Sequence, residues 1–446
     1  MEKSTGEDIV LLFDYYNQGS RDLLASFLNA GMQVKAAVIN DDGFLPDNVE
    51  NVFEYFLGPF YEGQPLYFNQ LKVPTYWEIS GNNSNGSVHD KSKERGRIFY
   101  SEPKNKRQVK VVDWLDDEGK VKASDHYNKY GVCYARTIFN KDEKKVSKSY
   151  FDKDGAEIIV ENFVTGDIIL NYEGVTNIFK NRTEFVVYYL KHKGYNNCRL
   201  FFNSLSIPFF VSNALPADEN RKCDILFWQE TIGGEIPGNM QLILDNKVGR
   251  CKRIAVQNSV SYDKLKKLSG AEKIIFKLGY IYPFEKPNLG RKEALICTNT
   301  ENVEKLKEVV AALPEVKFHV AALTEMSQKL LSHERYDNVI MYPNIKMSTL
   351  HTLFVQCDYY LDINHEGEIV NATRQAFIQN QLILAFNETS HGAFYTAPEN
   401  RFDSKDFRKL IYRLKDLLND KDKLKKAVES QQKWALTANS DDYDIN

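Results

Sequence analysis

Three side chains with binding chemistry follow one another where a buried strand is expected to end. Trp228, Gln229 and Glu230 close a strand expected over 224–229. An aromatic ring beside an amide and a carboxylate can stack on a sugar or a peptide and hydrogen-bond to its polar groups. The alternative is a packed strand end with a loop behind it. The candidate binding residues are Trp228, Gln229, Glu230 and, at an expected helix start, Asn239.

Signatures of metal, phosphate or nucleophilic catalysis are missing from the sequence. It has no glycine-rich phosphate loop, no Gly-x-Ser-x-Gly turn and no His-Glu-x-x-His helix; the 8 histidines are dispersed, and no pair of the 6 cysteines has metal spacing. Asp152 and Asp154 are spaced like the Asp-x-Asp that holds a metal–diphosphate in many sugar transferases. They precede Gly155 between two short strands, which favours a hairpin turn. We therefore expect neither a metal nor a cofactor.

Composition limits the class of protein. With 446 residues the chain has room for two or three domains. Its 58 basic and 61 acidic side chains give a net charge of −3, which argues against a nucleic-acid-binding protein. The apolar run over 9–13 is too short for a signal peptide, and the scattered cysteines do not form a disulfide framework. These features predict a cytoplasmic protein with reduced thiols.

The elements that must position the candidate residues alternate between strand and helix at both ends of the chain. A strand over 9–16, a helix over 20–30 that Gly31 ends, and a strand over 33–40 predict a parallel sheet. The alternation returns after Cys198. Further strands are expected over 199–205, 224–229, 253–257, 294–298, 317–321, 338–342, 359–363 and 382–386. Further helices are expected over 239–244, 302–313, 325–334, 348–357, 368–380, 404–418 and 420–435.

Between about 66 and 193 the helical periodicity disappears. Short aromatic and β-branched runs alternate there with turn signals, which predicts an antiparallel meander, and the polar run 80–87 is expected to be a mobile loop. We predict an α/β fold with the GT-B layout: two doubly wound, Rossmann-like domains with an antiparallel β-sheet insertion in the first. The expected division is 1–65 with 194–285, then 66–193, 286–403, and C-terminal helices and tail over 404–446. A ligand would then lie between the domains, at the carboxyl ends of the strands.

The GT-B layout allows a sequence test for catalysis. Retaining members hold the donor diphosphate with a Gly-Arg and a nearby Lys, and the donor sugar with two Glu residues eight apart. Here Thr298 and Asn299 follow the comparable strand with no cation nearby, and no second carboxylate lies eight residues after Glu366 or Glu368. Such a site would bind a nucleotide-sugar poorly and would not stabilise a departing diphosphate. The residues of this degraded donor site are Thr298, Asn299, Glu366, Glu368 and Arg374, and no catalytic residue is predicted.

Nearly the whole chain resembles one family. The segments that carry the resemblance are 12–18, 41–46, 65–70, 112–116, 125–128, 165–170, 227–230, 236–240 and 381–386. In this order they resemble the GtfB-type stabilising subunit, or glycosylation chaperone, of the bacterial accessory Sec system.

The resemblance implies a partner and a reaction. It implies a GT-B fold with an extended β-sheet insertion, in a hetero-oligomer with a homologous catalytic glycosyltransferase. That pair attaches N-acetylglucosamine from UDP-N-acetylglucosamine to Ser and Thr of serine-rich repeat adhesins before export, at the cytoplasmic face of the membrane. The resemblance implies that this subunit has no transferase activity on its own, in agreement with the degraded donor site. It also implies that the subunit binds the acceptor and stabilises its partner.

Two other functions stay open on the sequence, an active GT-B glycosyltransferase with an unusual donor site and a carbohydrate-binding module of unrelated role. The inserted sheet is the expected partner surface because exposed sheet edges suit pairing, although its tyrosines could equally form an ordinary core. A basic cluster could give peripheral contact with anionic lipid or could be a solvated loop face. The cluster comprises Lys91, Lys93, Arg95, Arg97 and the segment 104–110.

Overall fold

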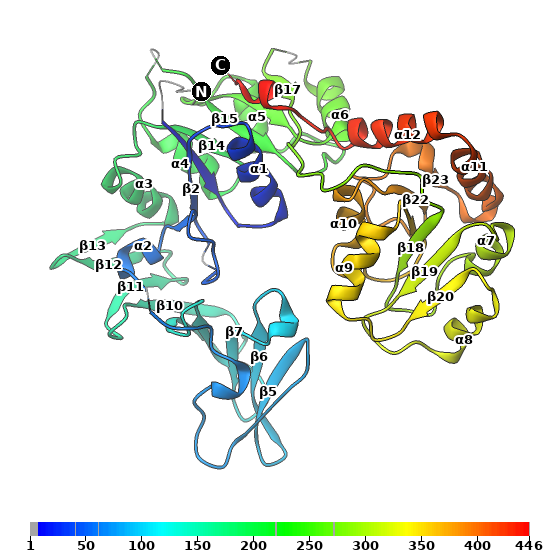
Figure 1. Ribbon diagram of the computed structural model, residues 1–446. Coiled ribbons are helices and arrows are strands. Elements are labelled where there is room, and N and C mark those ends of the chain that lie inside the picture. Colours follow the sequence, from blue (N-terminus) through cyan, green and yellow to red (C-terminus); the bar gives the residue numbers. More distant parts are fainter. Residues whose placement is uncertain (1–7, 41, 61, 219–220, 271–272, 446) are drawn as a thin grey trace.

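A computed structural model describes the chain except for residues 1–7, 41, 61, 219–220, 271–272 and 446. Two parallel sheets covered by helices and one antiparallel sheet make up the molecule (Figure 1). In that view the N-terminal α/β domain lies at the top, the inserted sheet below it and the C-terminal α/β domain to the right. The predicted fold class is confirmed.

The N-terminal sheet is parallel and has the strand order β17-β16-β15-β14-β1-β2-β3. The order reverses between β1 and β14, and such a switch point opens a crevice for ligands at the carboxyl ends of the strands. The strands are β1 (Ile9–Phe13), β2 (Val34–Val38), β3 (Glu50–Asn51), β14 (Arg199–Phe202), β15 (Asp224–Trp228), β16 (Cys251–Val256) and β17 (Ile275–Lys277). The helices are α1 (Gln18–Asn29), α2 (Glu54–Leu57), α3 (Arg182–His192), α4 (Ile207–Ala214), α5 (Gly238–Leu244) and α6 (Ser259–Ser269).

The first helix begins and ends where its sequence predicts. The Asn17 side chain accepts the backbone N–H of Ser20 at 3.0 Å and so caps α1. Gly31 follows the helix with a φ of 75°, a conformation that glycine adopts without strain. The cap and the glycine together place residues 14–18 at the mouth of the sheet.

The inserted sheet is an antiparallel meander in which each strand pairs with the next in sequence, β4 to β13. Its strands are β4 (Glu78–Gly81), β5 (Asn85–Asp90), β6 (Lys93–Tyr100), β7 (Val109–Leu115), β8 (Val121–Tyr127), β9 (Cys133–Phe139), β10 (Lys145–Phe151), β11 (Glu157–Asn162), β12 (Ile168–Tyr172) and β13 (Val175–Phe179). The predicted polar loop over 80–87 is wrong, because β4 and β5 form a hairpin there. Gly81 pairs with Gly86, and a Cβ on either residue would lie within 3 Å of the Tyr100 hydroxyl, so these glycines make room for a ring.

The expected absence of helix up to residue 193 is also wrong, because α3 fills 182–192. Asn181 caps this helix by accepting the N–H of Glu184 at 3.0 Å. Its buried side chains, Phe185 and Tyr189 among them, join the core shared by the N-terminal sheet and the inserted sheet. Aromatic and β-branched residues dominate the helix and favour strand by propensity, so packing decides the structure here.

The C-terminal domain repeats the doubly wound order, β20-β19-β18-β21-β22-β23. Its strands are β18 (Glu293–Cys297), β19 (Lys317–Ala321), β20 (Val339–Tyr342), β21 (Tyr359–Asp362), β22 (Leu382–Phe386) and β23 (Arg401–Phe402). Its helices are α7 (Leu306–Ala312), α8 (Gln328–Leu331), α9 (Met347–Gln356) and α10 (Ala372–Ile378), followed by α11 (Arg408–Asn419) and α12 (Lys421–Trp434). The helices α7, α8 and α10 are shorter than predicted. Each begins three or four residues later than predicted, and after Leu331 the helix α8 continues as a 3-10 turn over Ser332–Arg335.

The C-terminal tail returns to the N-terminal domain (Figure 1). Tyr443 is buried against Phe27 of α1, with ring centroids 4.9 Å apart, and its hydroxyl donates to the carbonyl of Gly279 at 2.7 Å. The Arg199 guanidinium donates to the carbonyl of Ile445 at 3.2 Å. The tail therefore ties the two α/β domains together. The division into 1–65 with 194–285, 66–193, 286–403 and 404–446 stays a prediction.

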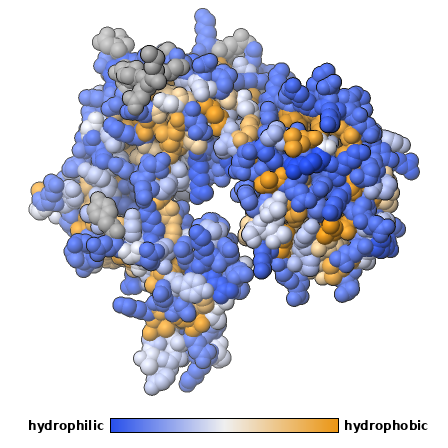
Figure 2. Space-filling model, viewed as in Figure 1, coloured by the Kyte–Doolittle hydropathy of each residue, from blue (hydrophilic) through white to orange (hydrophobic). Residues whose placement is uncertain are grey.

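The surface of the molecule is mostly hydrophilic on the face that Figure 2 shows. Apolar residues are scattered among the hydrophilic ones. Among the described residues no helix combines the length and the apolar character needed to cross a bilayer.

Candidate functional site

A cleft of about 590 Å³ lies between the carboxyl ends of the N-terminal strands and the C-terminal domain. Loops after β1, β14, β15 and β16 form one wall, and the loop that carries Phe394 and Tyr395 forms the other. The lining residues are Asp14, Tyr15, Asn17, Gln18, Gly19, Asp22, Asn203, Ser204, Gln229, Glu230, Gln257, Tyr280, Phe394 and Tyr395. The crevice therefore forms at the predicted switch point, and it contains two of the four candidate binding residues, Gln229 and Glu230.

Gln229 is the centre of a hydrogen-bond network in this wall. Its Nε2 donates to the carbonyl of Gly19 and to Oε1 of Gln257, both at 3.0 Å, and its Oε1 accepts from Asn203 Nδ2 at 3.1 Å. A Cβ on Gly19 would lie 2.5 Å from Gln229 Oε1, so glycine at this position leaves room for the Gln229 amide. The network holds the strand ends of β14, β15 and β16 in a fixed relation.

Two polar atoms of this network are buried without a partner among the described residues. They are Asn203 Oδ1, an acceptor, and Gln257 Nε2, a donor. Buried polar atoms are nearly always hydrogen-bonded in folded proteins, so an unsatisfied donor and acceptor beside a cleft call for a ligand or for ordered water.

Hydrogen-bond acceptors and aromatic rings dominate the rest of the cleft. Asp14 accepts from Asn40 Nδ2 at 2.7 Å and from the Ser204 hydroxyl at 3.1 Å, and burial raises the pKa of its carboxyl. Glu230 is exposed at the rim, and Tyr15 offers an exposed ring opposite Phe394 and Tyr395 of the other domain. Such a lining can accept hydrogen bonds from hydroxyl and amide groups and can stack on a sugar ring.

The other two candidate binding residues do not line the cleft. Trp228 is 4% exposed and belongs to the core of the N-terminal domain, so it cannot be the aromatic platform that its position suggested. Asn239 donates from Nδ2 to the carbonyl of Leu205 at 2.9 Å and so fixes α5 to the loop after β14. Tyr15 takes the place of Trp228. The bulky turn after the first strand was a signal for it, because parallel strand ends share one edge of a sheet.

The structure brings the five candidate donor-site residues to the carboxyl edge of the C-terminal sheet. The loops after β18 and β21 lie side by side, joined by a bridge between Val303 and Asn364. The Thr298 hydroxyl donates to the carbonyl of Thr300 at 2.7 Å and accepts its N–H at 3.0 Å, which closes a turn, while Asn299 is exposed. Glu366 lies 3.5 Å from the Thr300 hydroxyl.

The other two candidate donor-site residues are engaged by protein groups. Glu368 accepts the backbone N–H of Thr373 at 2.6 Å and also the Thr373 hydroxyl, at the start of α10. Arg374 crosses the cleft to Asp22 of α1, with Nη2 at 2.5 Å from Oδ1. Neither side chain is free to hold a nucleotide-sugar as the comparable residues of an active GT-B enzyme would.

A cation that the sequence did not suggest lies at the same edge. His391 Nδ1 is 2.7 Å from Asp362 Oδ1, and its Nε2 contacts the carbonyl of Glu366. The hydrogen bond from Asp362 raises the pKa of His391 to about 9, so the ring is protonated at neutral pH. Both ring N–H groups are used within the protein, which leaves neither of them for a diphosphate.

The remaining candidate motifs have structural roles. Asp152 Oδ1 accepts the N–H groups of Asp154 and Ala156, both at 2.9 Å, in the turn between β10 and β11, so the predicted hairpin is confirmed. In the basic cluster, Lys93 and Arg95 contact Asp117 at 2.6 and 2.8 Å. Lys110 contacts Asp42 at 3.0 Å. These contacts neutralise part of the cluster.

Models of known families match almost the entire chain. They are described as the GtfB N-terminal domain over 10–56, the GtfB middle domain over 77–180, the GtfB third domain over 182–268 and the GftB/GlyA-F C-terminal domain over 294–431. The middle-domain match covers the antiparallel meander, and the third-domain match begins at α3.

Several relatives carry the name UDP-N-acetylglucosamine–peptide N-acetylglucosaminyltransferase stabilizing protein GtfB. The protein from Streptococcus agalactiae is 44% identical over 92% of this chain and 92% of its own. The protein from Streptococcus gordonii is 41% identical over 96% of this chain and 95% of its own. A chain in a crystal structure of a GtfA/B complex bound to UDP and GlcNAc is 40% identical, with a TM-score of 0.92 over 97% of this chain and 98% of that one.

Proposed function

Because the chain belongs to the GtfB family of glycosyltransferase stabilising proteins, we propose that its interdomain cleft holds an acceptor polypeptide for a homologous catalytic subunit. The chain is the non-catalytic partner in this hetero-oligomer. The acceptor in the proposal is the Ser/Thr-rich repeat of an adhesin. The catalytic subunit modifies it with N-acetylglucosamine from UDP-N-acetylglucosamine before accessory Sec export.

The observation that carries the proposal is the contrast between the two walls of the cleft. In the N-terminal wall, Asn203 Oδ1 and Gln257 Nε2 lack partners among the described residues. On the C-terminal side, Glu368 and Arg374 are bound to protein groups. A cleft with an unpartnered hydrogen-bond acceptor and an unpartnered donor in one wall, and with its donor-sugar residues bound to protein groups in the other, supports polypeptide binding rather than sugar transfer.

The chemistry of the cleft suits a Ser/Thr-rich chain. Serine and threonine hydroxyls and backbone N–H groups are donors, and Asp14 and Glu230 supply acceptors for them. Tyr15 and Tyr395 can stack on a sugar that an acceptor already carries. Such a disordered acceptor has few apolar anchors, so its affinity per residue is low. Holding it beside the catalytic subunit raises the local acceptor concentration to about the millimolar range.

The proposed partner surface is the inserted sheet. Its last strand, β13, is an edge strand with exposed β-branched residues on both faces, among them Val175 on one face and Ile178, which is 68% exposed, on the other. An edge strand with exposed β-branched residues can pair with another chain and bury these side chains. In Figure 1 this edge lies on the side of the molecule away from the C-terminal domain, so the sheet can join the partner without filling the interdomain cleft.

The proposed location is the cytoplasmic face of the cell membrane, with peripheral contact through the basic cluster. Lys104 and Lys106 are exposed in the connection between β6 and β7. Each basic residue near an anionic surface contributes about 1 kcal/mol, so the contact would be weak and salt-sensitive.

Calorimetric titration of the isolated chain tests the acceptor site directly. An unmodified Ser/Thr-rich repeat peptide is one titrant, and UDP-N-acetylglucosamine is the other. We expect saturable heat with the peptide and none with the nucleotide-sugar. Binding of the nucleotide-sugar without binding of the peptide would contradict the proposal.

A further inference from the structure

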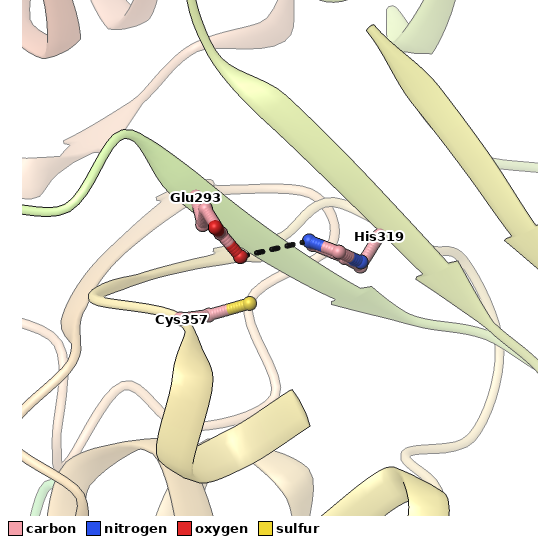
Figure 3. Close-up of side chains that lie close together, drawn as sticks. All are labelled: Glu293, His319 and Cys357. Carbon is pink, nitrogen blue, oxygen red and sulfur yellow. Dashed lines mark hydrogen bonds and ion pairs between the residues drawn. The ribbon is translucent and has the colours of Figure 1, made fainter. Parts of the chain in front are cut away.

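Three side chains of metal-ligand type meet on one face of the C-terminal sheet, although they are far apart in sequence. A carboxylate oxygen of Glu293, a ring nitrogen of His319 and the Sγ of Cys357 all lie within 4.8 Å of one another. Figure 3 shows the sulfur of Cys357 beside the hydrogen-bonded pair of Glu293 and His319. His319 and Cys357 are buried, whereas Glu293 is half-buried, so solvent can reach the cluster on one side.

Each of the three residues is placed by a different element. Glu293 is the first residue of β18, His319 is the central residue of β19, and Cys357 follows the last residue of α9. His319 is the register partner of Leu295, which lies two residues after Glu293, so both side chains point to the face that α9 covers. No sequence motif predicts this meeting, because separations of 26 and 38 residues match no known spacing of metal ligands.

Neighbouring groups orient the two polar members. His319 Nδ1 lies 3.0 Å from the Tyr342 hydroxyl, and His319 Nε2 lies 3.1 Å from Glu293 Oε2. Without a metal, Nε2 donates to Glu293 and Nδ1 accepts from the Tyr342 hydroxyl. A metal at Nε2 would take the place of that proton, and Nδ1 would then donate to Tyr342. Gln356 holds the same carboxylate by donating from Nε2. Metal-binding histidines show this arrangement, in which the second ring nitrogen is fixed by a hydrogen bond.

The bases around the cluster are partly neutralised. Lys286 and Arg291 both contact Asp358, at 2.6 and 2.9 Å, so their charges are partly balanced by that carboxylate. Lys317 is a third base near His319, but it is exposed to solvent, which screens its charge. Burial raises the pKa of the Cys357 thiol, so a metal would bind by displacing its proton.

We infer that Glu293, His319 and Cys357 form a zinc site, with solvent as the fourth ligand. Sulfur, imidazole and carboxylate are the donor set that zinc prefers, whereas magnesium and calcium prefer oxygen alone. Neighbouring ligand atoms around tetrahedral zinc are about 3.3 to 3.6 Å apart, given its bond lengths. The Glu293–His319 distance of 3.1 Å is already close to this, and the largest separation needs to shrink by about 1 Å.

The site lies away from the cleft, so a metal bound there would stabilise the fold and would not take part in ligand binding. Glu293 and Cys357 lie at the amino ends of β18 and β21, at the opposite edge of the sheet from the cleft. A metal there would clamp β18, β19 and the end of α9 without touching a ligand in the cleft. Binding of zinc to the folded state alone raises its stability by mass action.

Cobalt titration of the chelator-treated full-length chain tests the inference. Co²⁺ replaces zinc in such sites, and a thiolate ligand gives a charge-transfer absorption band in the near ultraviolet. We expect the band to saturate at one cobalt per chain and to vanish on addition of zinc. A 100-fold excess of zinc over its Kd should raise Tm by about 5 °C.

Two variants and a matched control make the result specific. Cys357→Ala should abolish the band, while Cys251→Ala, which removes a buried thiol of the N-terminal domain, should keep it. Glu293→Gln leaves a half-buried amide that still fits the fold and should weaken cobalt binding at least 10-fold. The inference is overturned if the wild-type chain gives no band, if the band survives Cys357→Ala, or if Glu293→Gln binds cobalt as tightly as the wild type.

Discussion

The Arg374 guanidinium on α10 lies 2.5 Å from the Asp22 carboxylate on α1, so an ion pair joins the two walls of the cleft. The two side chains are only 17% and 11% exposed, which sets this contact apart from the weak ion pairs of the surface. Arg374 lies on the side where an active GT-B enzyme would neutralise a diphosphate. In this chain it holds the domains in register instead.

Arg374→Ala should therefore loosen the two domains without changing nucleotide binding. We expect a coupling energy of about 1 to 3 kcal/mol between Arg374 and Asp22 in a double-mutant cycle with Asp22→Asn, measured by denaturant unfolding. Arg335→Ala, at an exposed position, is the control. Binding of UDP-N-acetylglucosamine by the wild type that is lost in Arg374→Ala would mean that the arginine serves a donor site after all.

Gln229→Ala should weaken acceptor binding about 10-fold, because it removes the amide that joins Gly19, Asn203 and Gln257. The measurement is the affinity of the isolated chain for a labelled Ser/Thr-rich peptide. Gln241→Ala removes the same side chain from an exposed position on α5 and should leave the affinity unchanged. An equal loss of peptide affinity in both variants would mean that the cleft is not the binding site of the peptide.

The His391–Asp362 pair predicts a pH dependence of stability. The hydrogen bond from Asp362 raises the pKa of His391 from 6.5 to about 9 in the folded state. Its contribution is fully present below pH 6.5 and is lost as the pH rises through 9. We expect the free energy of unfolding to fall by about 1 to 2 kcal/mol over this interval, since solvent reaching the half-buried ring weakens the pair.

His391→Gln should flatten this part of the stability profile, measured by urea unfolding at a series of pH values. A profile for the variant that runs parallel to the wild-type profile between pH 6.5 and 9 would assign the dependence to another group.

Tyr443→Ala should release the C-terminal tail from the N-terminal domain. The ring is buried on Phe27 and its hydroxyl donates to Gly279, so we expect a loss of about 3 to 5 kcal/mol and faster hydrogen exchange over 436–445. Tyr412→Ala, an exposed tyrosine on α11, should change neither. Unchanged exchange in Tyr443→Ala would mean that the tail does not tie the domains.

Ile178→Lys should weaken association with the catalytic subunit at least 10-fold if the β13 edge is the partner surface. The affinity of the two purified subunits is the measurement, with unfolding curves to establish that the variant is folded. Leu289→Lys places the same charge at an exposed apolar position outside the inserted sheet. An undiminished affinity for Ile178→Lys would move the interface away from this edge.

The strands of the two parallel sheets were predictable because buried strands appear in the sequence as short, continuous apolar runs. Lys317–Ala321 and Leu382–Phe386 have the bounds that the sequence predicted, and both are buried on two faces. The helix α3 was missed, because its aromatic and β-branched residues favour strand until the packing against two sheets is known. The hairpin at Gly81 and Gly86 could not be predicted, because the polar run around these glycines is typical of a loop. The two glycines make room for the Tyr100 ring, which is distant in the sequence.

The candidate site was predictable in position but not in composition. Parallel strand ends had to meet at the cleft, and Gln229 and Glu230 do line it. Trp228 does not, since alternation along β15 turns its ring into the core. The pairing of Arg374 with Asp22, 352 residues away, depends on how the domains close, which local patterns do not contain. The pairing of His391 with Asp362 depends on how the loops after β21 and β22 meet inside the C-terminal domain.

In the proposed function this chain binds the acceptor and transfers no sugar itself. Transfer from radiolabelled UDP-N-acetylglucosamine to an unmodified Ser/Thr-rich repeat protein tests it in three arms: this chain alone, the catalytic subunit alone, and both together. We predict no label with this chain alone, and extended labelling over many sites when both are present. Labelling by this chain alone would contradict the account and would make Glu366, Glu368 and Arg374 the first residues to substitute.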